Sequence, residues 1–457
     1  MASRRGLALL VALVLALAAC TEEASPPQPT APPDAFASTP TIGPSTTTRP
    51  APTTTLDLER VVLQRVDPVS LEPISAFEPI PMGDWMWGST TSADGRYLAA
   101  TINHDEGGNS ELRLVDLQSW IPVASWAESG DLIVQVDELG NIYYVTDQVG
   151  PEFRIAWAGG TDSTLVASLP NYGFWGANPV TDRLFVIYGT KIAEPGSDHP
   201  EQVMVATIDL DNDGAFTEIR VPVQVGRVDP YSQGPWASYL NTSPSFTWDP
   251  IGSRLLIVHG DEDAVTEVDP VSGAVAAHPV AGTLDPGLGA RRSSVVSPDG
   301  RSLYIATRSV ELIEDDDDWM VITRPAGVQA IDTTTWETVG RNDEPISDIW
   351  VSPSGTLLGS GYTTEESESV SWSESTGLYL LDGSNLNVRV HYPPETPDQW
   401  WGPVTFTDSG SIAYASTWVQ TPRVNAIEMA TGEFLSTAEG TETLEMIGPV
   451  GVLASTR

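Results

Sequence analysis

The sequence predicts an all-β protein made of repeated four-stranded units, and three observations lead to this prediction. A Ser-Pro-Asp-Gly stretch followed by a short apolar run stands at residues 297–307, and looser copies recur along most of the 457-residue chain. Most copies are followed by a second hairpin that carries an acidic residue between its strands. The apolar runs are too short for helices and fit strands that are buried on both faces.

The first half of each unit combines a turn with a strand, as in VSPDGRSLYIAT at residues 296–307. Proline fixes its own φ and glycine supplies a left-handed conformation, so this stretch ends one strand tightly and starts the next. The looser copies end at residues 101, 146, 189, 260, 361, 417 and 456.

The second half of each unit is a strand, an acidic residue, a few turn residues and another strand. A carboxylate at this place can accept backbone N–H groups of the turn, which gives the residue type a structural reason. The segment 154–167 lacks the acidic residue and fits the pattern poorly. The acidic residues elsewhere are Asp67, Asp116, Asp269, Asp332, Asp382 and Glu428.

Four strands in about 42 to 63 residues are the period of a β-propeller blade rather than of a helical array. An unpaired second hairpin at residues 60–77 precedes the first complete repeat, and an unpaired first half at 444–456 follows the last. Together they would complete one shared sheet and remove two open sheet edges. Seven complete repeats and one shared repeat predict eight blades. Seven blades are the alternative, because the segment 154–167 and the last copy are weak.

The rhythm SPDG-x-x-LY-IAT, followed by V-x-x-x-D-x-x-T/S, resembles the WD-repeat-like and YVTN-type propellers of bacterial surface proteins. The resemblance covers about residues 57–457 and implies a propeller domain there. The Trp-Asp and Gly-His pairs of true WD repeats are not repeated in this chain. The resemblance implies an architecture rather than an activity, because such folds carry many functions.

The first twenty residues have the parts of a lipoprotein signal peptide. Arg4 and Arg5 form a positive start, and the apolar run at 6–19 is too short to span a bilayer. The run ends in Leu-Ala-Ala-Cys, which resembles the bacterial lipobox, and Cys20 is the only cysteine of the chain. We therefore expect an extracytoplasmic protein, anchored to the membrane by an acylated Cys20. General secretion is favoured over the twin-arginine route.

Residues 21–56 are rich in Pro, Thr and Ser and contain almost no large apolar side chain. Such a segment cannot bury enough surface to fold, so it is expected to be a disordered, extended tether. The whole chain carries 62 acidic and 22 basic residues, for a net charge of −40. This charge argues against nucleic acid as a partner.

A Trp-Gly pair stands seven residues before a turn aspartate in three repeats. These segments should enter innermost strands at the rim of the central channel, where aromatic and arginine side chains could hold a glycan, a peptide or an anionic small molecule. The alternative is that the tryptophans pack between blades. The candidate ligand-binding residues are Trp85, Trp87, Trp175 and Trp401, with Arg291 and Arg292 at the corresponding place of another repeat.

Other acidic and histidine residues are candidates with weaker patterns. Asp209, Asp211 and Asp213 alternate around a glycine turn and resemble the start of a calcium-binding loop, but Arg220 stands where the last ligand belongs. A solvated acidic turn is favoured over calcium there. The histidines 104, 199 and 259 are interpreted as exposed loop residues, and the acidic runs 314–318 and 365–369 as solvated insertions that could form a contact surface.

These observations favour a binding or scaffolding module at the cell envelope, without a cofactor, whose partner is a protein, a glycan or a small molecule. The alternative is a propeller hydrolase or lyase, lactonase-like, with a metal in the channel. Converging carboxylates and histidines would favour the enzyme, and aromatic and arginine side chains alone would favour the binding module.

Overall fold

In the computed structural model, every regular element among the described residues is a β-strand. No helix among these residues has the length and apolar character needed to cross a membrane. The described residues are 61–83, 85–92, 94–103, 110–127, 132–146, 152–160, 163–168, 174–180, 183–189, 203–209, 215–223, 244–260, 262–280, 290–315, 318–367, 370–418, 422–439, 444–447 and 452–456.

Seven blades are contiguous in the chain, and each has its four strands in sequence order. The first three consist of β3 (Trp85–Thr91), β4 (Tyr97–Asn103), β5 (Ser110–Asp116) and β6 (Ile121–Trp126); β7 (Leu132–Val136), β8 (Ile142–Thr146), β9 (Glu152–Ala156) and β10 (Ser163–Ser168); and β11 (Phe174–Val180), β12 (Arg183–Gly189), β13 (Val203–Asp209) and β14 (Ala215–Val221). The segment 154–167, which fits the repeat poorly, thus forms an ordinary outer hairpin.

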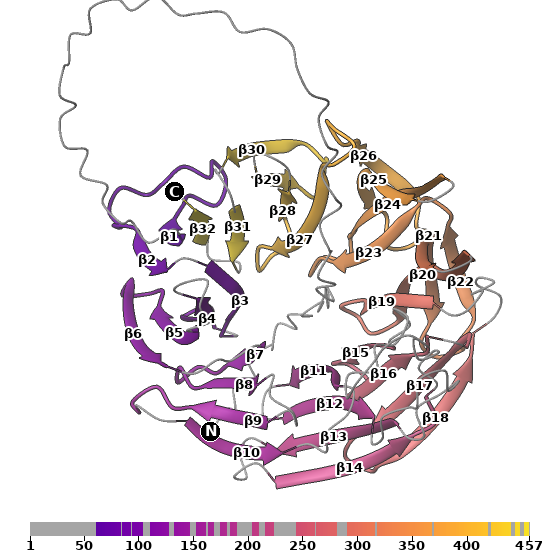
Figure 1. Ribbon diagram of the computed structural model, residues 1–457, viewed down its shortest axis with the longest axis horizontal. Coiled ribbons are helices and arrows are strands. Elements are labelled where there is room, and N and C mark those ends of the chain that lie inside the picture. Colours follow the sequence, from indigo (N-terminus) through magenta and orange to yellow (C-terminus); the bar gives the residue numbers. More distant parts are fainter. Residues whose placement is uncertain are drawn as a thin grey trace, which may run out of the picture. The chain divides into compact units, whose positions relative to one another are not determined.

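The next four contiguous blades complete the series. They consist of β15 (Ser245–Asp249), β16 (Arg254–Val258), β17 (Ala264–Asp269) and β18 (Ala274–Pro279); β19 (Ala290–Val296), β20 (Ser302–Asp315), β21 (Asp318–Asp332) and β22 (Thr338–Asn342); β23 (Ile346–Val351), β24 (Leu357–Ser367), β25 (Val370–Leu381) and β26 (Val388–Tyr392); and β27 (Trp400–Phe406), β28 (Ile412–Trp418), β29 (Arg423–Glu428) and β30 (Phe434–Glu439). Figure 1 shows the sheets following one another around a ring, with the first strand of each blade toward the middle.

One further sheet, the closing sheet, takes two strands from each end of the described chain. Its order is β2-β1-β32-β31. In the sequence these strands are β1 (Val61–Arg65), β2 (Ile80–Gly83), β31 (Leu444–Ile447) and β32 (Val452–Thr456). β1 and β32 pair antiparallel from Val61↔Thr456 to Arg65↔Val452, which is the pairing of chain ends that the sequence predicts.

The number of blades depends on how the closing sheet is counted. The all-β propeller that the sequence predicts is confirmed. Counted as contiguous units of the chain, the blades number seven, which is the alternative that the sequence left open. Counted as four-stranded sheets among the described residues, they number eight. The two counts differ because one sheet is assembled from both ends of the chain.

The Ser-Pro-Asp-Gly turns form as the sequence predicts. In the turn before β20, the N–H of Gly300 donates to the carbonyl of Ser297 at 2.8 Å, and Gly300 has a φ of 72°. The Ser297 hydroxyl donates to Asp299 and accepts the N–H of Ser302. A side chain at position 300 would strain the backbone, because this left-handed conformation favours glycine.

The acidic residue of each second hairpin holds its turn together. Asp332 accepts the N–H groups of Thr334 and Thr335, each at 2.8 Å, and these bonds lower the pKa of the Asp332 carboxyl. The N–H of Trp336 donates to the Asp332 carbonyl, and Trp336 has a φ of 62°. The same left-handed position, four residues after the acid, is occupied by Leu71, Trp120, Gly273, Leu386 and Gly432.

The hydrophobic core lies between the sheets rather than within any one of them. Leu112 and Leu114 of the first contiguous blade pack in one cluster with Ile142 and Tyr144 of the next. The closing sheet joins its neighbour in the same way, through Leu63 and the residues around it. Each sheet is therefore buried on both faces, which explains the short, continuous apolar runs in the sequence.

Candidate functional site

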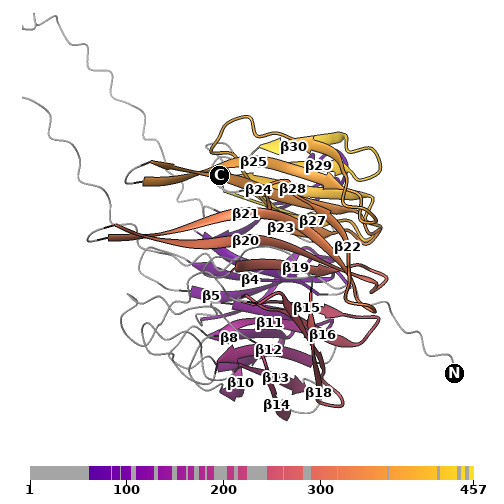
Figure 2. The ribbon, with the colours of Figure 1, turned by 90° about the vertical axis from the view of Figure 1, so that its right-hand side faces the viewer.

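The antiparallel order of the strands gives the ring two different faces. The turns between first and second strands, and between third and fourth strands, lie on one side, which we call the turn face. The connections between second and third strands, and from one sheet to the next, lie on the other, which we call the hairpin face. Figure 2 shows the long hairpins β20–β21 and β24–β25 projecting from the hairpin face.

The predicted rim segments all reach the hairpin face. They are the beginnings of β3, β11, β19 and β27, which are the first strands of their blades. Along the ring, β7, β15, β23 and β31 lie between them, so the four segments occupy every second sheet. At four of the candidate residues the structure describes the backbone and not the side chain. These are Trp85, Trp87, Trp175 and Arg291.

Trp401 packs between blades, as the alternative interpretation of the tryptophans states. Its side chain is buried among residues of the blades β23–β26 and β27–β30, with its ring centroid 6.4 Å from that of Tyr392. The preceding residue, Trp400, is 37% exposed, and its ring lies 5.7 Å from that of Tyr362. The exposed aromatic of this pair is therefore the one that the spacing rule did not select.

Arg292 is a buried link between two blades. Its guanidinium donates to Asp263 at 2.8 Å and to the carbonyl of Glu262 at 3.0 Å. The charge is matched by a local carboxylate, so Arg292 ties β19 to the connection that follows β16. Such a buried, paired arginine differs from the open anion-binding side chain that the sequence interpretation proposed.

His259 lies beside Arg292 and is buried, so its interpretation as an exposed loop residue is wrong. Its Nε2 lies 2.7 Å from the Thr266 hydroxyl. Burial, assisted by the positive charge of Arg292, lowers the pKa of His259 to about 4. The imidazole is therefore neutral at physiological pH, and it serves the packing of this connection.

The metal and anchor predictions fall largely outside the described residues. Asp209 ends β13, while Asp211, Asp213 and Cys20 are not among the residues that the structure describes. In the described part of the chain, no group of three or more His, Cys, Asp or Glu side chains is arranged to hold a metal ion.

The sequence reasoning missed two exposed tryptophans on the hairpin face. Trp400 and Trp418 are directly paired across β27 and β28, and Trp418 is 63% exposed. Tyr362 of the neighbouring blade contacts Trp400. Tyr362 itself is buried, so the exposed aromatic residues here are Trp400 and Trp418. The signal in the sequence is a Trp at the start of β27 and another at the end of β28, but only the strand register places them opposite each other.

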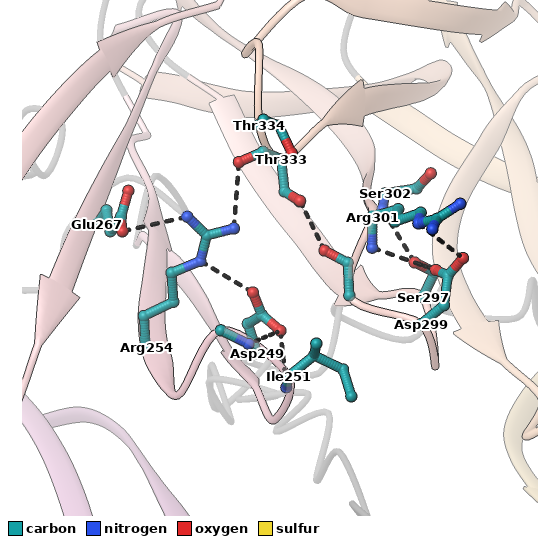
Figure 3. Close-up of polar contacts among 12 residues, drawn as sticks. Asp249, Ile251, Arg254, Glu267, Ser297, Asp299, Arg301, Ser302, Thr333 and Thr334 are labelled. Carbon is teal, nitrogen blue, oxygen red and sulfur yellow. Dashed lines mark hydrogen bonds and ion pairs between the residues drawn. The ribbon is translucent and has the colours of Figure 1, made fainter.

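The turn face carries a polar junction of a structural kind, drawn in Figure 3. Arg254 binds Asp249 at 2.9 Å, Glu267 at 3.1 Å and the carbonyl of Thr333 in the next blade at 3.1 Å. The Thr333 hydroxyl donates to the carbonyl of Gly300 at 2.6 Å. The donors of the guanidinium are used within the protein, so this junction joins two blades.

Comparisons with known proteins support the fold. Neither a protein-family model nor a curated protein matches the sequence. A solved structure of dihydro-heme d1 dehydrogenase NirN, in complex with DHE, is similar with a TM-score of 0.54 and 16% identity over 84% of this chain and 74% of that one. The β-propeller domain of the Trilobed protease from Pyrococcus furiosus has a TM-score of 0.44 and 10% identity over 76% of this chain and 95% of that one. At 16% identity the first likeness concerns the fold alone, and no activity follows from it.

Proposed function

We propose that this protein is an extracytoplasmic binding or scaffolding module, held at the membrane by an acylated Cys20, and that it meets its partner with the hairpin face. The observation that carries the proposal is the pair of elongated hairpins on this face. Such elements add nothing to the closure of the ring, and loops on a rigid scaffold are where binding residues gather.

The two elongated hairpins come from adjacent blades and support each other. β20 and β21 continue to the pair Asp315↔Asp318, and β24 and β25 continue to Ser367↔Val370. The Thr364 hydroxyl donates to the carbonyl of Thr323 at 2.7 Å, which joins one hairpin to the other. A doubly supported projection is rigid enough to serve as a contact surface.

The tips of both hairpins are acidic in sequence. Residues 314–318 read EDDDD, and residues 365–368 read EESE. In a protein with a net charge of −40, a concentrated acidic projection attracts a basic surface and repels an acidic one. We therefore propose a basic partner protein for the hairpins.

The expected tether gives the ring room to reach such a partner. A flexible chain of the length of residues 21–56 has a root-mean-square span of about 30 Å or more, and its prolines extend it further. The ring would then sample a shell around its membrane anchor rather than a single height. A single acyl chain holds a protein only marginally, so stable anchoring would need more than one chain on Cys20.

The contact is tested by placing a photo-activatable amino acid at one position in intact cells. Position Thr363, exposed on the hairpin β24–β25, should give a discrete cross-linked adduct. Position Val271, which is 77% exposed in a turn on the opposite face, is the control and should give none. Equal adducts from both positions, or none from Thr363, would contradict the proposed contact face.

The anchor is tested separately by cell fractionation. Cys20→Ala should release the protein from the membrane or leave it unprocessed. If the variant stays with the membrane fraction in mature form, the proposed anchor is wrong and the contact face is unaffected.

A further inference from the structure

We infer that the outer edge of β25, in the second elongated hairpin, binds an extended basic segment of the partner protein as an added β-strand. This inference rests on the proposed contact through the hairpin face, and it names the surface and the way the partner binds. An added strand is held by hydrogen bonds between main chains, while its alternate side chains give specificity. The edge of β25 offers open main-chain groups and a matching charge.

Both elongated hairpins continue beyond the outermost strand of their blade, and a glycine stands where the two separate. β26 ends at Tyr392, whereas β24 and β25 continue past it. Gly377 of β25 has a φ of 104°, and a Cβ there would collide with the carbonyl oxygen of Tyr392. Gly327 of β21 has a φ of 94° and stands against the carbonyl oxygen of Asn342 in the same way. The separation therefore depends on glycine in both blades, and it leaves an outer edge on β21 and on β25.

The outer edge of β21 is covered by the second hairpin. The carbonyl of Arg324 turns inward to β20, where the Ser309 hydroxyl donates to it at 3.3 Å. The carbonyl of Thr323 therefore turns to the outer edge, because successive residues of a strand point in opposite directions. There it accepts the Thr364 hydroxyl at 2.7 Å, and the Thr323 hydroxyl lies 2.8 Å from that of Tyr362. Side chains of β24 thus occupy this edge.

The outer edge of β25 has no such cover in the part of the chain that the structure describes. The N–H of Ser375 donates outward to the carbonyl of Pro397 at 2.9 Å. Ser373 and Ser371 direct their N–H and C=O groups to the same edge, because alternate residues of a strand do so. Ser373 is exposed, and β26 pairs with β25 only from Leu378 onward. In the next blade, β28 and β29 have seven and six residues, against eleven and twelve in β24 and β25, so they are too short to run alongside this edge.

The charge around this edge selects a basic strand. Residues 365–376 read EESESVSWSEST, with four glutamates and no basic residue, and Asp398 is exposed directly after Pro397. Lysine or arginine at alternate positions of an added strand would lie on one face of the sheet, within reach of Glu374 and its neighbours. An acidic strand is repelled, and so is a second copy of this chain, with its net charge of −40. Charged side chains on an open edge exclude unmatched strands in this way.

The experiment titrates the purified protein with three labelled peptides of about seven residues, up to about 1 mM, and follows their fluorescence anisotropy. One alternates lysine with threonine. The second alternates lysine with proline, which keeps the charge and removes N–H groups that a strand needs. The third alternates glutamate with threonine and should not bind. The lysine–threonine peptide should bind at least about tenfold more tightly than the lysine–proline peptide, because main-chain pairing adds to the charge attraction. Equal binding of the two lysine peptides, or no binding of either, would overturn the inference.

Ser373→Pro removes one outward N–H and leaves the bonds between β24 and β25 in place, because an edge strand accepts proline where the N–H faces solvent. Ser373→Ala is the matched control and keeps this N–H. The proline variant should weaken binding of the lysine–threonine peptide about tenfold, while the alanine variant stays within about twofold of the parent. Neither should change binding of the lysine–proline peptide, and both should melt at the temperature of the parent. In the complex, amide exchange should slow at Ser371 and Ser373. Equal affinities of the two variants would contradict strand addition, and a dimer of the parent that Ser373→Pro abolishes would assign the edge to a second copy instead.

Cross-linking in cells separates this inference from the proposed contact face. With the photo-activatable amino acid at Thr363, the adduct should form in the Ser373→Ala background and fall about tenfold in the Ser373→Pro background. An adduct of equal yield in both backgrounds would support the contact face and overturn strand addition. If no background gives an adduct, the contact face is wrong, and the peptide titration decides whether the edge binds a strand.

Discussion

The phenolic hydroxyl of Tyr414 donates a hydrogen bond of 2.9 Å to the backbone carbonyl of Pro68, which lies 346 residues earlier in the chain. Tyr414 belongs to β28, and Pro68 follows Asp67 in the turn of the closing sheet. Tyr304 makes the equivalent bond of 2.8 Å to Gly383, which follows Asp382. Burial raises the pKa of Tyr414 to about 12, so the phenol remains a donor at physiological pH. The closing sheet is therefore attached by the same bond that joins two contiguous blades.

Tyr414→Phe should destabilise the ring by about 1–3 kcal/mol, because the carbonyl of Pro68 loses its partner. Chemical denaturation measures the loss, and amide exchange locates it in β1 and β32. Tyr304→Phe is the matched control, with a similar loss of stability and no faster exchange in the closing sheet. Unchanged amide exchange of β1 in the Tyr414 variant would show that the hydrogen bond from Tyr414 to Pro68 does not hold the ring closed.

Leu386→Gly should destabilise the protein even though Leu386 has a φ of 60°. Relief of the left-handed conformation gains about 1–2 kcal/mol, but loss of a Leu side chain that is 1% exposed costs more, about 2–5 kcal/mol. Ser253→Gly removes the same kind of strain at an exposed residue with a φ of 51°, and should raise stability by up to about 1 kcal/mol. Thermal unfolding should show a lower melting temperature for Leu386→Gly and a higher one for Ser253→Gly. A stabilised Leu386 variant would show that relief of the left-handed conformation outweighs the lost packing.

Arg254→Lys should cost several kcal/mol, on the order of 3, because the compact ammonium of lysine does not reproduce the planar fork that reaches two carboxylates and a carbonyl, and it leaves Asp249, whose side chain is 1% exposed, poorly paired. The control is Arg301→Lys, which changes an ion pair that is 83% and 63% exposed and should leave the free energy of unfolding nearly unchanged. Equal effects of the two substitutions on denaturant unfolding would remove the special role of the Arg254 junction.

Stability should fall as the pH drops from about 6.5 toward 4, in part through His259. Its folded pKa is about 4 and its usual value is 6.5, so in this window the unfolded chain binds a proton that the folded chain excludes. Each further pH unit then favours unfolding by up to about 1.4 kcal/mol from this group. His259→Gln should flatten the profile between pH 4 and 6.5, as measured by melting temperature, relative to the parent. A parallel profile in the variant would assign the acid sensitivity to other groups.

The repeat was readable because each turn is encoded locally. Asp332 accepts N–H groups two and three residues ahead, so the residue type that makes the bond stands inside the motif that reports it. The left-handed residue four positions later was less visible, since Leu71, Trp120, Trp336 and Leu386 stand where glycine is expected. Packing of a large side chain into the neighbouring sheet overrides the local preference at these places.

The candidate site was less predictable, because contacts with other blades decide which of its side chains are buried and which are exposed. Trp400 and Trp401 are adjacent and chemically identical, yet one is exposed and the other packs against Tyr392. His259 precedes a run of acidic residues that suggests exposure, but the fold buries it, within electrostatic reach of Arg292 from the next blade. Neither arrangement has a signature within a single stretch of the sequence.

The closing sheet also sets the order in which the ring can form. β1 comes early and must wait for β32, which is central in the sheet and is made only when residues 452–456 leave the ribosome. Until then the inner edge of β1 is unpaired, and the first and last contiguous blades have no common neighbour. The ring therefore cannot close before the last strand is available, and cooperative closure is deferred to the final step.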